Sequence, residues 1–84
     1  MVYYLIICRS LTYAQRTARS LERAGINAYI LRTPRVIAGE GCSHAVKVSQ
    51  RRLPEALRAL SRAGIPAQRL FILEPDGSYR EVGL

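Results

Sequence analysis

The sequence has few of the residues on which most enzymes and metal proteins depend. Its 84 residues include two cysteines, one histidine and six acidic residues. Two cysteines are too few for a disulfide framework, and His44 beside Cys42 lacks metal-site spacing and a second ligand pair. Gly39-Glu40-Gly41 lacks the rest of a phosphate-binding motif. We therefore expect no metal, no cofactor and no conventional hydrolase, kinase or dehydrogenase activity.

A membrane-spanning segment is also missing. The opening apolar run, Val2–Cys8, is seven residues long, whereas a spanning helix needs about 20. Arg9 follows the run and nothing basic precedes it, which is the reverse of a signal peptide. We expect a buried strand and a cytoplasmic protein.

Positive charge is abundant, because twelve arginines and one lysine give a net charge of +7. Such an excess favours an acidic partner, such as nucleic acid, an anionic ligand or an acidic protein surface. A solvated arginine-rich surface explains the same composition. Charge alone therefore does not choose a function.

The chain contains an internal repeat. Leu21–Ala28, with the sequence LERAGINA, recurs as LSRAGIPA in Leu60–Ala67. Each copy ends a helical pattern at a glycine, Gly25 or Gly64, and precedes a strand pattern. The two halves therefore share one plan: strand, helix, glycine stop, strand.

The remaining patterns complete the element order. The predicted strands are Val2–Cys8, Asn27–Arg32, His44–Ser49 and Gln68–Leu73. Apolar residues spaced by three and four predict a helix capped by Ser10 or Thr12, with the stripe Leu11, Ala14, Ala18 and Leu21. A second helix starts near Pro54, with the stripe Leu53, Ala56, Leu57 and Leu60. Thr33–Ser43 is an irregular loop, Pro75–Gly77 a turn, and Ser78–Leu84 a short strand or a frayed tail.

Strand, helix, strand, repeated once, predicts a single α+β domain over residues 1–84 with the ferredoxin-like order β-α-β-β-α-β. Its antiparallel sheet would carry both helices on one face, with the first and third strands central. The first strand is apolar on both faces, so residues such as Tyr4 and Ile6 need cover. The tail or a second copy would supply it, and we expect a homodimer.

This topology gathers polar residues at one edge of the sheet. The first strand ends and the third begins there, which brings Cys8 close to Cys42, and a Cys8–Cys42 disulfide is open if their Cα atoms come within about 7 Å. The start of the first helix favours an anion nearby. The other residues expected there are Arg9, Ser10, Arg32, Arg35, Ser43 and His44.

These residues suit an ionisable thiol. Positive charge stabilises the nucleophilic thiolate, Ser43 can hydrogen-bond a persulfide or oxyanion, and His44 can move a proton. Each also has a plainer explanation. Cys8 can be a small apolar residue of the core. His44 can be an ordinary surface residue, and the arginines can simply be solvated.

Around the loop Thr33–Ser43, the sequence resembles a bacterial family of small domains described as selenium/sulfur carrier protein-like. The resemblance rests on Tyr3–Ile7, on Ala24–Ile26, and on Thr33–Cys42 with its Pro-Arg pair ahead of a cysteine. It covers roughly the first 50 residues. Family members often have glycine after that cysteine, where this chain has Ser43, which would be strained in a left-handed conformation.

The resemblance implies a carrier or accessory protein rather than an enzyme, with Cys42 as the carrier residue. Donor and acceptor proteins of sulfur or selenium transfer would be its partners. Cys8 enters only through the topology, as an assisting thiol.

Two other functions stay open. A ferredoxin-like sheet can stack nucleic-acid bases on aromatic residues of its central strands, and Tyr3 and Tyr4 lie on the first. His44–Ser49 has no aromatic residue, so the usual basic-aromatic signature is missing. The third option is a regulatory or interaction module.

Overall fold

A computed structural model of the chain describes residues 2–39, 44–67 and 69–83. The elements in these residues are β1 (Tyr3–Cys8), α1 (Leu11–Arg23), β2 (Tyr29–Arg32), β3 (His44–Ser49), α2 (Leu53–Arg62), β4 (Arg69–Leu73) and β5 (Tyr79–Val82), with short 3-10 turns η1 (Arg35–Ile37) and η2 (Gln50–Arg52). The predicted α+β class is confirmed.

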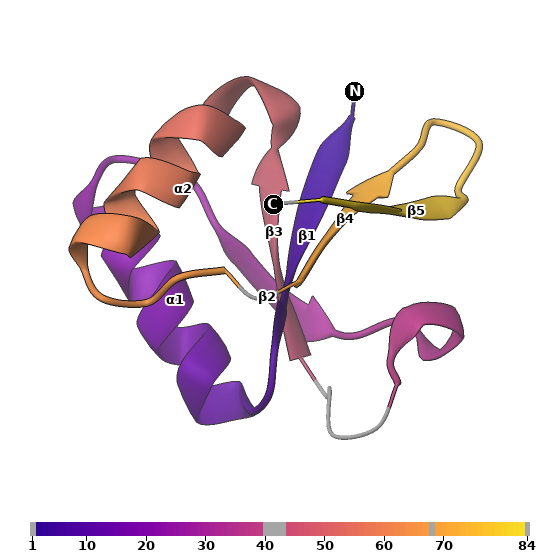
Figure 1. The fold of residues 1–84 in the computed structure, drawn as a ribbon, viewed down its shortest axis with the longest axis horizontal. Helices are drawn as coiled ribbons and strands as arrows, with labels where there is room; N and C mark the ends of the chain where they lie inside the picture. Colours follow the sequence, from indigo (N-terminus) through magenta and orange to yellow (C-terminus); the bar gives the residue numbers. More distant parts are fainter. Residues whose placement is uncertain (1, 40–43, 68, 84) are drawn as a thin grey trace.

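The strands form one antiparallel sheet in the order β2-β3-β1-β4-β5. β1 and β3 lie inside it, side by side, as predicted. Figure 1 shows α1 and α2 on one side of this sheet and η1 on the other. The tail forms β5, which pairs with β4 through the turn that Pro75–Gly77 predicted.

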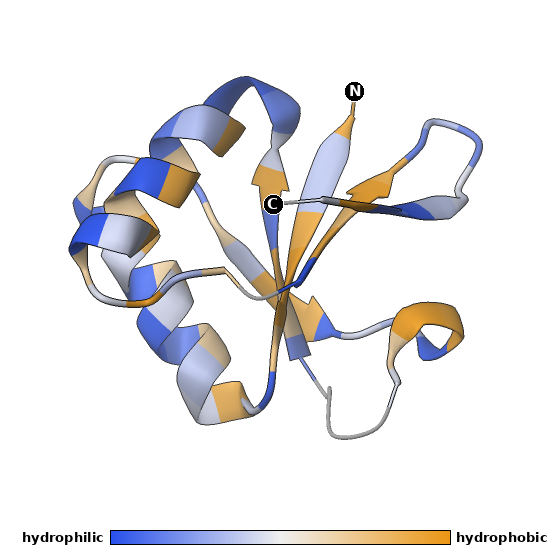
Figure 2. Cartoon of the chain, viewed as in Figure 1, coloured by the Kyte–Doolittle hydropathy of each residue, from blue (hydrophilic) through white to orange (hydrophobic). Residues whose placement is uncertain are grey.

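Side chains of β1 alternate between two apolar clusters, as a strand's two-residue period requires. Ile6 and Cys8 belong to the larger cluster on the helix side. That cluster also holds Ala14, Ala18, Leu21, Ile26, Ala28, Val46, Val48, Ala56, Leu60, Ile65 and Leu70. The hydrophobic residues of the strands and the inner helix faces carry the apolar colour of Figure 2. Burying each large aliphatic side chain contributes about 1.5–3 kcal/mol.

The opposite, helix-free face holds a second cluster built on Leu5 and Ile7. It also contains Ala45 and Phe71, and the partly buried Leu31, Ile37 and Tyr79 pack against it. The expectation about Tyr4 and Ile6 was wrong in its assignment of faces, because both pack on the helix side. Leu5 and Ile7 are the residues that need cover. Side chains of η1 and β5 supply it, and the homodimer stays a prediction.

The repeat appears as two helix ends of the same geometry. Gly25 and Gly64 have φ of 79° and 73°. The N–H of Ile26 donates to the Leu21 carbonyl, and that of Ile65 to the Leu60 carbonyl, each at 2.9 Å. Both ends are Schellman motifs, in which the residue after the glycine folds back onto the last turn.

Three local features differ from those predicted. Leu11, assigned to the apolar stripe, is 45% exposed at the first position of α1, and Thr17 is buried instead. β2 begins at Tyr29, where its pairing with β3 starts, rather than at Asn27. The loop after β2 contains η1, since Ile37 donates its N–H to the Pro34 carbonyl at 3.0 Å and anchors on the sheet.

Candidate functional site

β1 and β2 end, and β3 begins, at one edge of the sheet. In the strand register, His44 stands opposite Cys8 on one side and opposite Arg32 on the other. Residues opposite each other in a sheet share a face, so all three belong to the helix side. The register therefore places the ends of β1 and β2 beside the start of β3, while the predicted approach of Cys8 to Cys42 stays a prediction.

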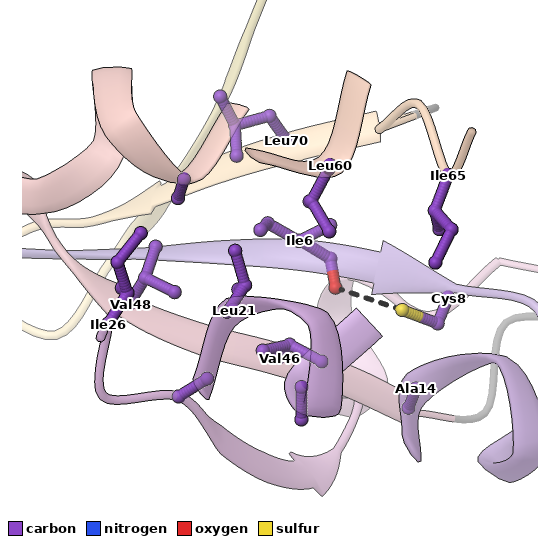
Figure 3. Packing of buried hydrophobic residues seen from close by; sticks show 13 residues of the cluster. Ile6, Cys8, Ala14, Leu21, Ile26, Val46, Val48, Leu60, Ile65 and Leu70 are labelled. Carbon is purple, nitrogen blue, oxygen red and sulfur yellow. Dashed lines mark hydrogen bonds between the residues drawn. The ribbon is translucent and has the colours of Figure 1, made fainter. Parts of the chain in front are cut away.

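Cys8 lies inside the helix-side cluster, with 2% of its surface exposed. Its single S–H can donate to the Ile6 carbonyl, at 3.6 Å, or to Thr17 Oγ1, at 3.9 Å. Figure 3 shows the sulfur directed toward the Ile6 carbonyl, among side chains of the same cluster. The buried position matches the plainer expectation, that of a small core residue, and an assisting role for Cys8 stays a prediction.

The first turn of α1 begins at the same edge. Ser10 has extended backbone, and its hydroxyl accepts the N–H of Tyr13 at 3.1 Å, which makes it the N-cap that Ser10 or Thr12 was expected to provide. The neighbouring Arg9 is exposed, and its guanidinium carbon lies 5.4 Å from the Tyr13 ring centroid. A fixed helix N-terminus and an exposed cation therefore adjoin the end of β1.

The loop after β2 crosses toward β4 on the helix-free face. Arg35, in η1, is exposed. A Cβ added to Gly39 would lie 3.6 Å from Arg69 Nη1, on β4. Arg69 therefore lies beside this loop. The sequence patterns did not reveal this contact, because the position of Arg69 depends on pairing between strands that are distant in the chain.

Arg69 is held on two sides. It donates to both Glu81 carboxylate oxygens, at 2.9 and 3.0 Å, and its guanidinium carbon lies 5.1 Å from the Phe71 ring centroid. The hydrogen bond from Arg69 lowers the pKa of the Glu81 carboxyl below its ordinary value. β5 therefore keeps Arg69 in place beneath the loop.

Thr33 is a further polar residue at this edge that the sequence patterns did not single out. It follows the last residue of β2 and is buried, and its hydroxyl oxygen has no hydrogen-bond partner within the described part of the chain. A threonine directly after a strand and before a proline gives no specific signal, because such residues are common at strand ends.

Cys42 and Ser43 lie outside the described residues, so their expected roles stay predictions. In the described ranges no group of three histidine, cysteine or acidic residues could hold a metal ion. The helices within those ranges are too short or too polar to cross a membrane.

A family model described as "Putative Se/S carrier protein-like" matches residues 3–72, which run from β1 into β4. The chain belongs to this family. Neither the curated proteins nor the solved structures gave a match.

Membership in the Se/S carrier-like family confirms the resemblance and extends it. The match reaches beyond the first 50 residues into the second half, which sequence motifs alone left generic. It also spans Cys42, Ser43 and the whole edge described above.

Proposed function

We propose that the chain is a sulfur or selenium carrier that holds the transferred atom on Cys42. The family match across residues 3–72 is the observation that carries this proposal. A second observation supports it, because Cys42 stands two residues before His44, the residue that pairs with Cys8 and Arg32 at the shared edge.

Of the two cysteines, Cys42 is the better carrier. Cys8 is packed in the core and hydrogen-bonded there, so a donor protein would have to open the fold to reach it. Its assisting role, if it has one, would be to support the end of β1. The atom to be transferred therefore goes to the thiol of the loop.

The transfer needs no oxidant. The Cys42 thiolate attacks the outer sulfur of a donor protein's cysteine persulfide, the donor's sulfur–sulfur bond breaks, and the donor cysteine leaves as a thiolate. Cys42 then holds the persulfide, and a nucleophile of the acceptor takes the terminal sulfur in the same way. A perselenide would follow the same steps.

Groups at the edge would stabilise the negative charge that both steps require. Arg9, Arg32 and Arg35 are exposed cations on the segments around it, and positive charge favours a thiolate. Ser43 and His44 follow Cys42 in the chain and would donate hydrogen bonds or move the proton. The same exposed cations would dock an acidic surface of the donor.

The test is intact-mass spectrometry after incubation with a cysteine desulfurase and cysteine under anaerobic conditions. The wild-type chain should gain the mass of one sulfur atom, and a reductant should remove it. Cys42→Ala should gain none, while the matched variant Cys8→Ala should still be loaded. No adduct on the folded wild type, or an adduct that persists in Cys42→Ala, would contradict the carrier role.

We further propose that β2-β3-β1-β4 with its two helices is a ferredoxin-like unit to which β5 has been added. The antiparallel pairing and the position of both helices on one face support this assignment. The protein would act in a reducing cytoplasm, where Cys42 stays a thiol. Donor and acceptor proteins would be its partners, and it would not turn over a substrate itself.

A further inference from the structure

A polar hollow lies at the opposite end of β1 from Cys8. Its volume is about 580 Å³, and it is lined by Tyr3 at the start of β1, Tyr29 at the start of β2, and Lys47 and Ser49 on β3. Hollows of about 300–1,000 Å³ are typical of small-molecule sites. Because β1 spans six residues, at about 3.3 Å each, this hollow is well separated from the edge assigned to Cys42.

Lys47, the single lysine of the sequence, lines this hollow. Its ammonium nitrogen lies 4.7 Å from the Tyr3 ring centroid and 5.8 Å from that of Tyr29. No carboxylate pairs with it among the described residues. The positive charge is held by two aromatic rings alone, so it remains available to an anion.

Two arginines also line the hollow, and among the described residues only one of them is engaged by other groups of the protein. Arg52 binds Glu55 at 3.1 Å and donates to the Gly25 carbonyl at 3.3 Å, which joins the start of α2 to the end of α1. Arg51 is exposed and forms no salt bridge within the described ranges. Lys47 and Arg51 therefore carry the uncompensated charge.

The aromatic surface beside this charge is exposed. Tyr29 is 58% exposed, and it lies directly opposite Lys47 on the neighbouring strand. A simple inorganic anion would use the two cations and leave the rings without a role. A ligand that combines negative charge with a flat ring uses both.

β3 has no aromatic residue of its own, but the tyrosines of the two neighbouring strands lie beside its lysine. The alternation of side chains places Tyr29 and Tyr3 on the same helix-free face as Lys47, with β3 between their strands. The basic and aromatic surface is built from β1, β2 and β3 together rather than from the two central strands. A search along β3 alone does not find it.

We propose that this hollow binds a nucleotide unit, either as a free nucleotide or within a single strand of nucleic acid. Lys47 and Arg51 contact the phosphate, and the base stacks on Tyr29 and Tyr3. Moving the ammonium from the rings to the phosphate uncovers ring surface for the base. This site is independent of the sulfur carrier role.

The test measures binding of a labelled single-stranded oligonucleotide by fluorescence anisotropy, and of adenosine monophosphate by calorimetry, at several salt concentrations. Lys47→Gln should weaken binding about tenfold or more and reduce the salt dependence by about one phosphate contact. Tyr29→Ala should weaken it about 5- to 150-fold, and Tyr29→Phe should retain it. Arg62→Gln removes an equal charge from the far end of α2 and should leave the affinity unchanged.

Oligonucleotide binding that far exceeds mononucleotide binding assigns the unit to a single strand, and equal affinities assign it to a free nucleotide. The proposal is overturned if neither ligand binds at low salt, or if Arg62→Gln weakens binding as much as Lys47→Gln. It is also overturned if an oligonucleotide without bases binds as tightly as one with them. Circular dichroism of each variant separates loss of binding from loss of folding.

Discussion

The two cysteines are expected to differ in reactivity, Cys8 as a buried core residue and Cys42 as the proposed carrier thiol. The Cys8 thiol is buried in the core, within hydrogen-bonding reach of the Ile6 carbonyl and the Thr17 hydroxyl. Reaction of such a thiol depends on the opening of the surrounding structure, which costs several kcal/mol in a stable domain. We therefore expect chemical reactivity to distinguish the two cysteines without any transfer partner.

With Cys42 replaced by alanine, Cys8 should react with an alkylating reagent at least about 100-fold more slowly in buffer than in denaturant. The time course of intact mass in both conditions measures this ratio. Rapid labelling of Cys8 in buffer would show that β1 opens at its end. The reciprocal variant, Cys8→Ala, reports the reactivity of Cys42 by the same assay.

At the scale of the elements, the repeat is expressed in the two helix ends. Gly25 and Gly64 adopt the same left-handed conformation, and a Cβ added at either would meet nothing within 4 Å. The cost of alanine is therefore a backbone cost alone, because no neighbouring atom has to move.

Gly25→Ala and Gly64→Ala should each lower the free energy of unfolding by about 1–2 kcal/mol, and by similar amounts. Urea denaturation measures both. Gly83→Ala is the matched control, since its added Cβ also meets nothing and its φ is not left-handed. We expect Gly83→Ala to stay within about 0.5 kcal/mol of wild type. A large difference between the two helix-end variants would mean that the halves are not equivalent.

The elements were predictable where their causes are local. A continuous apolar run predicted β1, alternation predicted β3, and Gly25 and Gly64 marked both helix ends. Features that depend on register were not predictable. The cover of Leu5 and Ile7 by Ile37 comes from a Pro- and Gly-rich stretch without periodicity.

The candidate sites divide in the same way. That β1 ends where β3 begins follows from strand order and was predicted, and the register there places Cys8 opposite His44. The contact between Lys47 and Tyr29 depends on the exact register between β2 and β3. Short sequence patterns do not specify that register. The Arg69–Glu81 pair likewise requires that the tail form β5 rather than fray.

At the scale of the whole molecule, the two halves of the repeat are interleaved rather than adjacent. β3, from the second half, lies between β1 and β2 of the first half. The first half on its own would leave β1 and β2 without any strand partner, since both pair with β3. The repeat units are therefore not independent folding units, despite their similar plans.

Fragments 1–38 and 39–84 should each be largely unfolded alone, and an equimolar mixture should regain sheet and helix signal. The physical reason is that the apolar faces of β1 can be buried only when both parts are present. Circular dichroism and heteronuclear spectra of the separate and mixed fragments measure this. A cooperative thermal transition in either fragment alone would contradict it.

The central position of β1 also affects synthesis of the chain. Both neighbours of β1 in the sheet, β3 and β4, are translated after it. Until β3 has emerged from the ribosome, β1 has no strand partner, and Leu5 and Ile7 lack Ala45 and Phe71 of their cluster. The nascent N-terminal segment is thus a surface that chaperones would bind until residues 44–49 emerge.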